Sequence, residues 1–179
     1  MTNLRSTDDD FMRQAIALGD GGSAAGELPF GALVVNPSGT VIGASQQMTM
    51  RGKDYSQHAE VAAMAIAAAS FKASNGKLQG CTLYSTVEPC AMCSFIARQY
   101  EVARVVFGLK APITGGVSHW HVLDDATINK TVMGFLDMAF AAPPVIVSGV
   151  LVDEVMDGWA RWNLIEAEAL WAAGVFVKE

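Results

Sequence analysis

Residues 56–70, SQHAEVAAMAIAAAS, are the stretch that most constrains the fold of this chain. Alanine and other apolar residues fill most of it, which predicts a helix packed inside the protein from about His58 to Ser70. The helix nevertheless starts with His58 and Glu60, and an imidazole and a carboxylate are seldom buried without partners. Both residues are therefore candidates for a site at the first turn of a core helix.

Helical and β-rich segments alternate along the rest of the chain. Helices are predicted over residues 6–22, 89–100 and 153–174, and strands over residues 30–35, 40–45, 81–87, 103–109 and 143–152. Asp8 to Asp10 are expected to cap the first helix, and Gly19, Gly21 and Gly22 to end it. Asn36-Pro37-Ser38-Gly39 is a hairpin signal between the first two strands. The alternation predicts a layered α/β sandwich around one central sheet, in a single domain spanning residues 1–179.

Two segments lack a regular pattern. Residues 72–80, KASNGKLQG, are predicted to form an exposed loop. Residues 110–125, KAPITGGVSHWHVLDD, are the longest stretch without helix or strand periodicity. Long irregular loops in compact domains are often functional, so this segment is a candidate for part of a site.

Composition excludes several classes of protein. Hydrophobic residues make up 51% and charged residues 17%, as expected of a packed globular protein. The net charge of −6 argues against a broad basic surface for nucleic acid. The N-terminus lacks a basic and then apolar leader, and no apolar run approaches the roughly 20 residues that cross a bilayer. We therefore expect a soluble, cytoplasmic protein without a membrane partner.

The segment PCAMC carries two of the three cysteines. Cys90 and Cys93 are three residues apart at a predicted helix start, so both sulfurs can face one side. The helix N-terminus favours thiolates, and two thiolates in this position suit Zn²⁺ or redox chemistry. The alternative is two buried cysteines without a chemical role, because a free cysteine often behaves as a small hydrophobic residue. An odd number of cysteines does not indicate a disulfide framework.

The segment HAE can complete a metal site. His58 offers a neutral nitrogen ligand, but Glu60 would point away from it in a regular helix. Both residues reach one site only if the helix starts here. Zinc held by one histidine and two cysteines keeps a fourth position open for water, which is typical of catalytic sites. A nearby carboxylate then suits proton transfer better than metal binding. The alternative for HAE alone is a satisfied core histidine beside an acidic residue that favours the helix dipole.

In combination, HAE, 28 intervening residues and PCAMC resemble the H-x-E…P-C-x-x-C signature of the zinc-dependent cytidine/deoxycytidylate deaminase superfamily. The blocks PFGALVV, TLYSTVEPCAMC and RVVFGL are similar to those of bacterial guanine deaminases and tRNA adenosine deaminases. The resemblance covers roughly Phe11 to Gly116. It implies a three-layer α/β/α sandwich with a central five-stranded mixed sheet, the cytidine deaminase-like fold.

The resemblance also implies roles for particular residues. It assigns zinc binding to His58, Cys90 and Cys93, and catalytic proton transfer to Glu60. It places the substrate base against the backbone at Ala59 and Glu88 and against the side chain of Phe30. Relatives usually carry an asparagine where this chain has Gln47, so Gln47 is a candidate substrate contact that departs from the family pattern.

The segment SHWH lies in the long irregular loop. By the same resemblance, His119, Trp120 and His121 are candidate substrate contacts, with Trp120 placed to stack on a base. Alternate residues of an extended loop face opposite ways, so at most one of the two histidines is expected to point inward. The alternative is a surface loop with an aromatic anchor.

The sequence therefore predicts zinc-dependent hydrolytic deamination of a free purine-type base or a related amino-heterocycle, with guanine as the first candidate. Deamination of tRNA adenosine and deamination of cytosine or a nucleoside are the alternatives. A zinc-stabilised interaction module without catalysis is a different class, and Glu60 argues against it. The C-terminal helix is acidic, so nucleic acid is not the expected partner. By analogy with relatives, we expect a homodimer.

Overall fold

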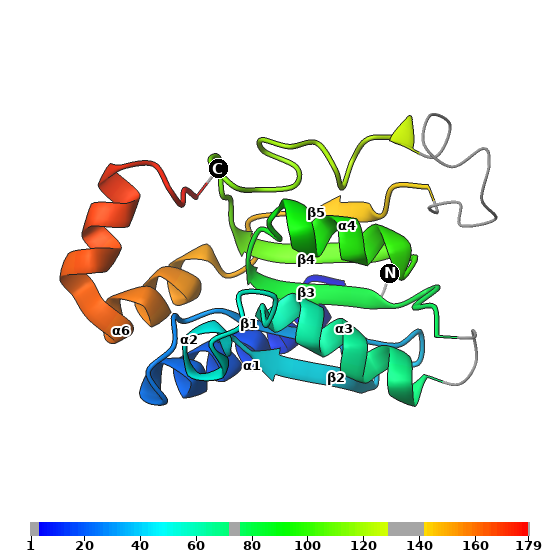
Figure 1. The fold of residues 1–179 in the computed structure, drawn as a ribbon, viewed down its shortest axis with the longest axis horizontal. Coiled ribbons are helices and arrows are strands. Elements are labelled where there is room, and N and C mark those ends of the chain that lie inside the picture. Colours follow the sequence, from blue (N-terminus) through cyan, green and yellow to red (C-terminus); the bar gives the residue numbers. More distant parts are fainter. Residues whose placement is uncertain (1–3, 72–75, 129–141, 179) are drawn as a thin grey trace.

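A computed structural model describes residues 4–71, 76–128 and 142–178, and these form a layered structure around one sheet (Figure 1). The five strands are β1 (Gly31–Val35), β2 (Val41–Gln46), β3 (Thr82–Val87), β4 (Arg104–Leu109) and β5 (Val145–Val147). Their order in the sheet is β2-β1-β3-β4-β5. β1 pairs antiparallel with β2 and β3, whereas β3, β4 and β5 run parallel. The predicted five-stranded mixed sheet is confirmed.

Helices cover both faces of the sheet. They are α1 (Leu4–Ala24), α2 (Thr49–Gly52), α3 (Ala59–Ser70), α4 (Ala91–Gln99) and α6 (Val152–Ala172). α3 and α4 lie side by side on one face, and their buried side chains share a core cluster with Val34, Leu83 and Val105. α1 and α6 contribute to a second cluster with Leu33, Tyr84 and Val106. The neighbouring strand residues alternate between the two clusters, as a sheet buried on both sides requires. The predicted three-layer sandwich is confirmed.

The small side chains of α3 have a packing reason. β2 passes so close to α3 that a methyl group added at Gly43 would overlap the carbonyl oxygen of Ala63 and lie 2.7 Å from the backbone nitrogen of Ala67. Larger residues on either element would push the helix off the sheet. The alanine-rich sequence of α3 therefore fits the close approach of a helix that presents catalytic candidates at its N-terminus.

The predicted hairpin connects β1 and β2. The Asn36 side-chain oxygen accepts hydrogen bonds from the backbone nitrogens of Ser38 and Thr40, both at 3.0 Å. Gly39 adopts φ +82°, which an L side chain rarely tolerates.

Among the described residues, no helix combines the length and the apolar composition that a membrane-spanning segment requires.

The bounds of α1 differ from the prediction. The helix begins at Leu4 and continues through all three glycines to Ala24, so these glycines do not end it. Gly19 lies against the turn before β1, where a methyl group would sit 2.7 Å from the carbonyl oxygen of Pro29. Glycine is used here for close approach. Asp8 lies inside the helix and is not a cap.

The fifth strand is shorter than predicted, and the C-terminal helix is less regular than predicted. The fifth strand covers Val145–Val147 alone, because the chain turns into α6 through Gly149 and Leu151, at φ +79° and +52°. α6 is interrupted at Asn163, whose φ of −163° and ψ of 104° are not helical. Of the loop predicted over residues 72–80, residues 72–75 lie outside the described residues, and the remainder forms turns.

Asp8 joins α1 to two strands. Arg104 donates two hydrogen bonds to its carboxylate, at 2.8 and 2.6 Å, and the Tyr84 hydroxyl donates a third at 2.8 Å. Burial alone would raise the pKa of Asp8, but these hydrogen bonds and the Arg104 charge outweigh it and hold the pKa below its usual value. Asp8 therefore stabilises the fold in its ionised form.

Asp8→Asn is expected to lower the free energy of unfolding at pH 7 by about 1.5–3 kcal/mol, the range for hydrogen bonds to charged groups. The folded-state pKa is the lower one, so this contribution is complete above the unfolded pKa of about 4 and is lost as the pH falls through the folded pKa. Urea unfolding of both proteins from pH 7 to strong acid would measure it. A difference that stays constant into strong acid would contradict this account.

Candidate metal centre and active-site pocket

His58 and Cys90 occupy equivalent positions at the starts of two neighbouring helices. Each is the N-cap residue, with extended backbone angles: φ −68° and ψ 147° at His58, and φ −64° and ψ 173° at Cys90. Because α3 begins at Ala59, Glu60 lies in the first turn and can face the same side as His58. Cys93 lies in the first turn of α4. The helix start that the HAE spacing requires is present.

The three ligand candidates converge. The His58 Nδ1 atom lies 3.7 Å from Cys90 Sγ and 3.5 Å from Cys93 Sγ, and the two sulfurs are 3.5 Å apart. A tetrahedral zinc with ordinary Zn–S and Zn–N bonds separates such ligand atoms by about 3.5–3.8 Å. The donor set of one imidazole and two thiols therefore fits zinc in both chemistry and spacing.

The two cysteines differ in their electrostatics. The hydrogen bond with Cys93, followed by the interaction with His58, lowers the pKa of Cys90 to about 4 against the opposing effect of burial. The same hydrogen bond between the two sulfurs, together with deeper burial, raises the pKa of Cys93. Cys90 is thus the more acidic thiol of the pair, and it lies at a helix N-terminus that favours negative charge.

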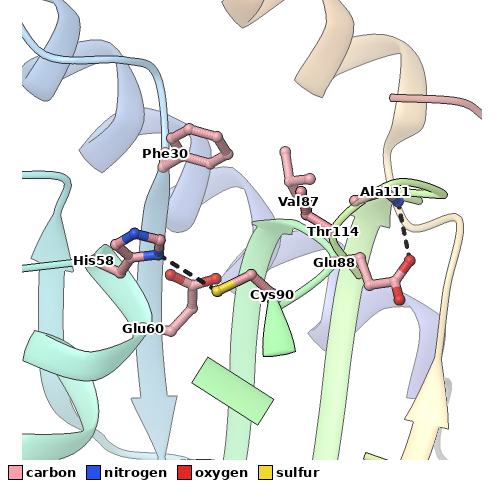
Figure 2. Close-up of a pocket in the computed structure, with 8 residues that line it drawn as sticks. All are labelled: Phe30, His58, Glu60, Val87, Glu88, Cys90, Ala111 and Thr114. Carbon is pink, nitrogen blue, oxygen red and sulfur yellow. Dashed lines mark hydrogen bonds between the residues drawn. The ribbon is translucent and has the colours of Figure 1, made fainter. Parts of the chain in front are cut away.

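Glu60 lies beside this cluster. Its side chain is almost fully buried, and the Ser85 hydroxyl donates a hydrogen bond of 3.4 Å to its Oε1 atom. Burial is the largest cause that raises the pKa of Glu60, and the negative charge of Cys90 raises it further. In Figure 2 its carboxylate points towards the space between His58 and Cys90. A carboxyl group in this position is suited to exchanging protons with a reacting molecule.

A cavity of about 150 Å³ opens next to these side chains (Figure 2). Its lining consists of Phe30, His58, Glu60, Val87, Glu88, Cys90, Ala111 and Thr114. The apolar members provide flat or aliphatic walls, His58, Glu60 and Cys90 lie together, and Glu88 and Thr114 lie towards Ala111. Pockets for drug-sized ligands occupy roughly 300–1,000 Å³, so this cavity suits a single small ring system.

The side chain of Glu88 organises one wall of the pocket. Its carboxylate accepts hydrogen bonds from the backbone nitrogens of Ala111, Val117 and Ser118, at 2.9, 2.8 and 2.7 Å, and from the Ser118 hydroxyl at 2.5 Å. Figure 2 shows it turned away from His58 towards Ala111. A methyl group at Gly115 would overlap this carboxylate. Glu88 therefore connects the Cys90 segment to the irregular loop that supplies Ala111 and Thr114, a role that sequence reasoning missed.

Gln47 and Ala59 lie near the pocket without being part of its lining. Ala59 is the buried first residue of α3. The Gln47 backbone nitrogen donates to the Phe30 carbonyl at 3.0 Å, and its side-chain nitrogen donates to the Thr49 hydroxyl at 3.3 Å. Its Oε1 atom is buried and has no hydrogen-bond partner within the described residues. Gln47 thus has an unused side-chain acceptor, and its backbone binds that of Phe30.

Ser118 of the SHWH segment binds Glu88, but His119, Trp120 and His121 are not part of the cavity lining. His119, Trp120 and His121 are all exposed, and Trp120 retains 59% of its accessible surface. The His119 and Trp120 rings contact each other at a centroid distance of 4.9 Å, and His121 lies 3.4 Å from Asp124. The structure does not bring these three residues together with the metal-ligand candidates.

Comparison with known proteins identifies the family. Residues 5–109 match the family model of the cytidine and deoxycytidylate deaminase zinc-binding region, which is more than half of the 179 residues. The chain belongs to this deaminase family. It is accordingly a zinc-dependent hydrolase that acts as a deaminase, and His58, Cys90 and Cys93 form its candidate zinc site. The predicted family, enzyme class and metal are confirmed.

Individual relatives agree with this assignment. The deaminase is 33% identical over 148 residues to the tRNA-specific adenosine deaminase of Haemophilus influenzae, covering 82% of this chain and 78% of the relative. A solved structure from a study of tRNA:A34 deaminases that perform A-to-I editing superposes with a TM-score of 0.70 at 26% identity, covering 83% and 98% of the two chains. The guanine deaminase of Bacillus subtilis is 31% identical with a TM-score of 0.53, covering 57% of this chain and 64% of that one.

Proposed function

We propose that this deaminase hydrolyses the amino group of a free purine-type base, with guanine as the first candidate substrate. The observation that carries the proposal is the small cavity that joins a candidate zinc site to the buried carboxyl group of Glu60. Water adds to the ring carbon that bears the amino group, the carbon–nitrogen bond breaks, and the products are ammonia and an oxo-substituted base.

The chain supplies defined groups for this reaction. His58, Cys90 and Cys93 would hold zinc, and zinc bound there makes water acidic enough to react near neutral pH. Glu60 takes a proton from the attacking water and delivers it to the departing amino nitrogen. The hydrogen bond from Ser85 holds the Glu60 carboxyl group in place for both transfers.

Other pocket residues position the base. Phe30 and Val87 provide apolar surfaces for the ring, and the loop attached to Glu88 closes the side formed by Ala111. The backbone at Ala59 and Glu88 and the unused acceptor of Gln47 are proposed to bind polar edges of the base. Glutamine carries the same amide as the asparagine of relatives on a longer stem, so the bound ring is expected to sit further from β2.

Charge favours a free base over a nucleic acid. The chain carries a net charge of −6, and six of its basic residues form ion pairs with carboxylates: Arg13, Arg51, Lys77, Arg104, Arg161 and Lys178. Nucleic acid binding depends on basic side chains that are available to phosphates. Pairing with carboxylates weakens that attraction.

Ammonia release by the zinc-loaded protein tests the proposal. The panel should contain guanine, other free bases, nucleosides, pterin- and triazine-like amino-heterocycles and a tRNA anticodon hairpin. The expected result is fastest release from a free purine-type base. Activity on the hairpin alone would overturn the proposal.

Deamination of tRNA adenosine is the second candidate. The observation that favours it is the 33% identity to a tRNA-specific adenosine deaminase over 82% of this chain. Inosine formation in the hairpin, together with a rate that falls steeply as salt rises, would support it, because phosphate contacts are weakened by salt.

We also propose a homodimer formed through the outer surface of α3 and α4. These helices lie side by side (Figure 1), and Ile66 on α3 and Phe95 on α4 retain 49% and 43% of their accessible surface. Both residues are on helices that cover the same face of the sheet, and exposed apolar surface is typical of protein–protein contacts. Light scattering is expected to give twice the 18.9 kDa mass of the chain. The chain mass itself at micromolar concentration would contradict this.

A further inference from the structure

The pocket wall at Phe30 is supported from behind by residues far along the chain. Trp159 of α6 and Phe176 of the C-terminal segment both meet the Phe30 ring edge-on, at centroid distances of 5.1 and 6.0 Å and interplanar angles of 86° and 81°. They also contact each other at 4.9 Å. Trp159 retains 1% and Phe176 8% of its accessible surface, whereas Phe30 is half-buried. Phe30 is thus the one ring of the three that lines the cavity.

The backbone holds the C-terminal segment against the opposite side of the same pocket. Val177 and Lys110 exchange two backbone hydrogen bonds, at 2.9 and 3.0 Å. Lys110 directly precedes Ala111, which lines the cavity. The chain reaches this position because Gly174, at φ +66°, turns it back after α6, and the segment then returns towards the end of β4 (Figure 1). The C-terminal segment therefore contacts Phe30, which forms one wall of the pocket, and Lys110, the neighbour of a second wall residue.

We propose that Phe176, together with Trp159, is a positioning residue that fixes the Phe30 ring and so sets the width of the base-binding pocket. This inference rests on the proposed function, in which the cavity binds a heterocyclic base. Edge-on aromatic contacts restrict both the position and the tilt of the central ring. Without Phe176, a void opens behind Phe30, and the ring can retreat from the cavity.

The Phe176 side chain can be removed without detaching the segment. The two hydrogen bonds between Val177 and Lys110 involve backbone atoms alone, so they do not depend on the side chain at position 176. Phe176→Ala therefore tests the support of Phe30, and not the presence of the C-terminal segment. Phe176→Leu keeps most of the volume and is the variant to use if the alanine variant does not fold.

Binding can be measured without turnover in the zinc-loaded, full-length Glu60→Gln protein. The probe is 2-aminopurine, whose fluorescence falls when it stacks on an aromatic ring. Adding Phe176→Ala is expected to weaken binding about 3–10-fold, the range for one lost aromatic contact. It is also expected to lower the preference for 2-aminopurine over its larger riboside, because the wall has moved back. Phe176→Leu should give an intermediate value.

Leu78→Ala is the matched control for general destabilisation. Leu78 is fully buried and lies before Thr82, the first residue of β3, whereas the pocket residue Val87 is the last residue of that strand. Its substitution should change neither the affinity nor the riboside preference by more than about twofold.

Unchanged binding in Phe176→Ala would overturn the proposal, and so would an equal loss in Leu78→Ala or the absence of 2-aminopurine binding to the Glu60→Gln parent. The proposed function fails on a different measurement, the absence of ammonia release from every free base by the wild-type protein. The two failures are therefore distinguishable.

Discussion

Glu60→Gln is expected to lower kcat by about 10²–10⁴-fold, the usual contribution of general acid–base catalysis. Glutamine keeps the shape and the hydrogen-bonding capacity of the side chain but cannot accept and return a proton at this position. Glu60 is buried, lines the cavity and is oriented by Ser85, so no solvent-exposed acid can readily replace it. Steady-state ammonia release with the best substrate of the panel measures the effect.

Zinc content and thermal stability separate this effect from damage to the site. Glu60 is not one of the three converging ligand candidates, so the variant should bind as much zinc as the wild type and unfold at a similar temperature. Ser85→Ala removes the orienting hydroxyl but keeps the carboxyl group, and its kcat should fall between the two. Full activity in Glu60→Gln would show that another group transfers the proton.

The metal centre could be predicted from the sequence because its determinants are local. His58 and Cys90 are N-cap residues, and Glu60 and Cys93 follow within one turn, so short spacings determine which way each side chain points. The five-stranded mixed sheet between two helix layers could also be predicted, through the resemblance of the strand blocks to a known family. Both the local spacings and the family resemblance can be recognised without knowledge of contacts between residues far apart in sequence.

The supporting contacts could not be predicted in this way, because they join residues far apart in sequence. The sequence predicts Asp8 as a helix cap, yet it lies inside α1 and pairs with Arg104 on β4. Glu88 lies two residues before the predicted metal ligand Cys90, yet its carboxylate accepts hydrogen bonds from backbone nitrogens of a loop without periodicity. Phe176 supports Phe30 from the other end of the chain. The roles of His119, Trp120 and His121 stay predictions, since the loop that carries them leaves them exposed.

Cys90→Ala is expected to abolish zinc binding and to lower the activity at least 10³-fold. The activation of water by zinc is lost, and with it the proton transfer that acts on that water, which itself contributes about 10²–10⁴-fold. Two remaining ligands do not complete a zinc site that needs three from the protein. Cys90 is preferable to Cys93 for this test, because Cys93 is fully buried and its loss would also disturb packing beneath α4. Metal analysis of the purified variant checks the first part, and ammonia release checks the second.

Comparison of the wild type with Cys90→Ala also tests how removal of zinc by a chelator affects stability. A ligand that binds the folded state alone stabilises it by about 2.7–4.1 kcal/mol when present at 100 to 1,000 times its Kd. Chelation should therefore lower the Tm of the wild type but leave the Tm of Cys90→Ala unchanged. Cys81→Ala is the matched control: Cys81 is a buried thiol outside the converging group, so this variant should keep zinc, activity and the response to chelation. If Cys81→Ala lost zinc and Cys90→Ala retained it, the metal could not lie between α3 and α4, and the assignment of Glu60 beside it would fail as well.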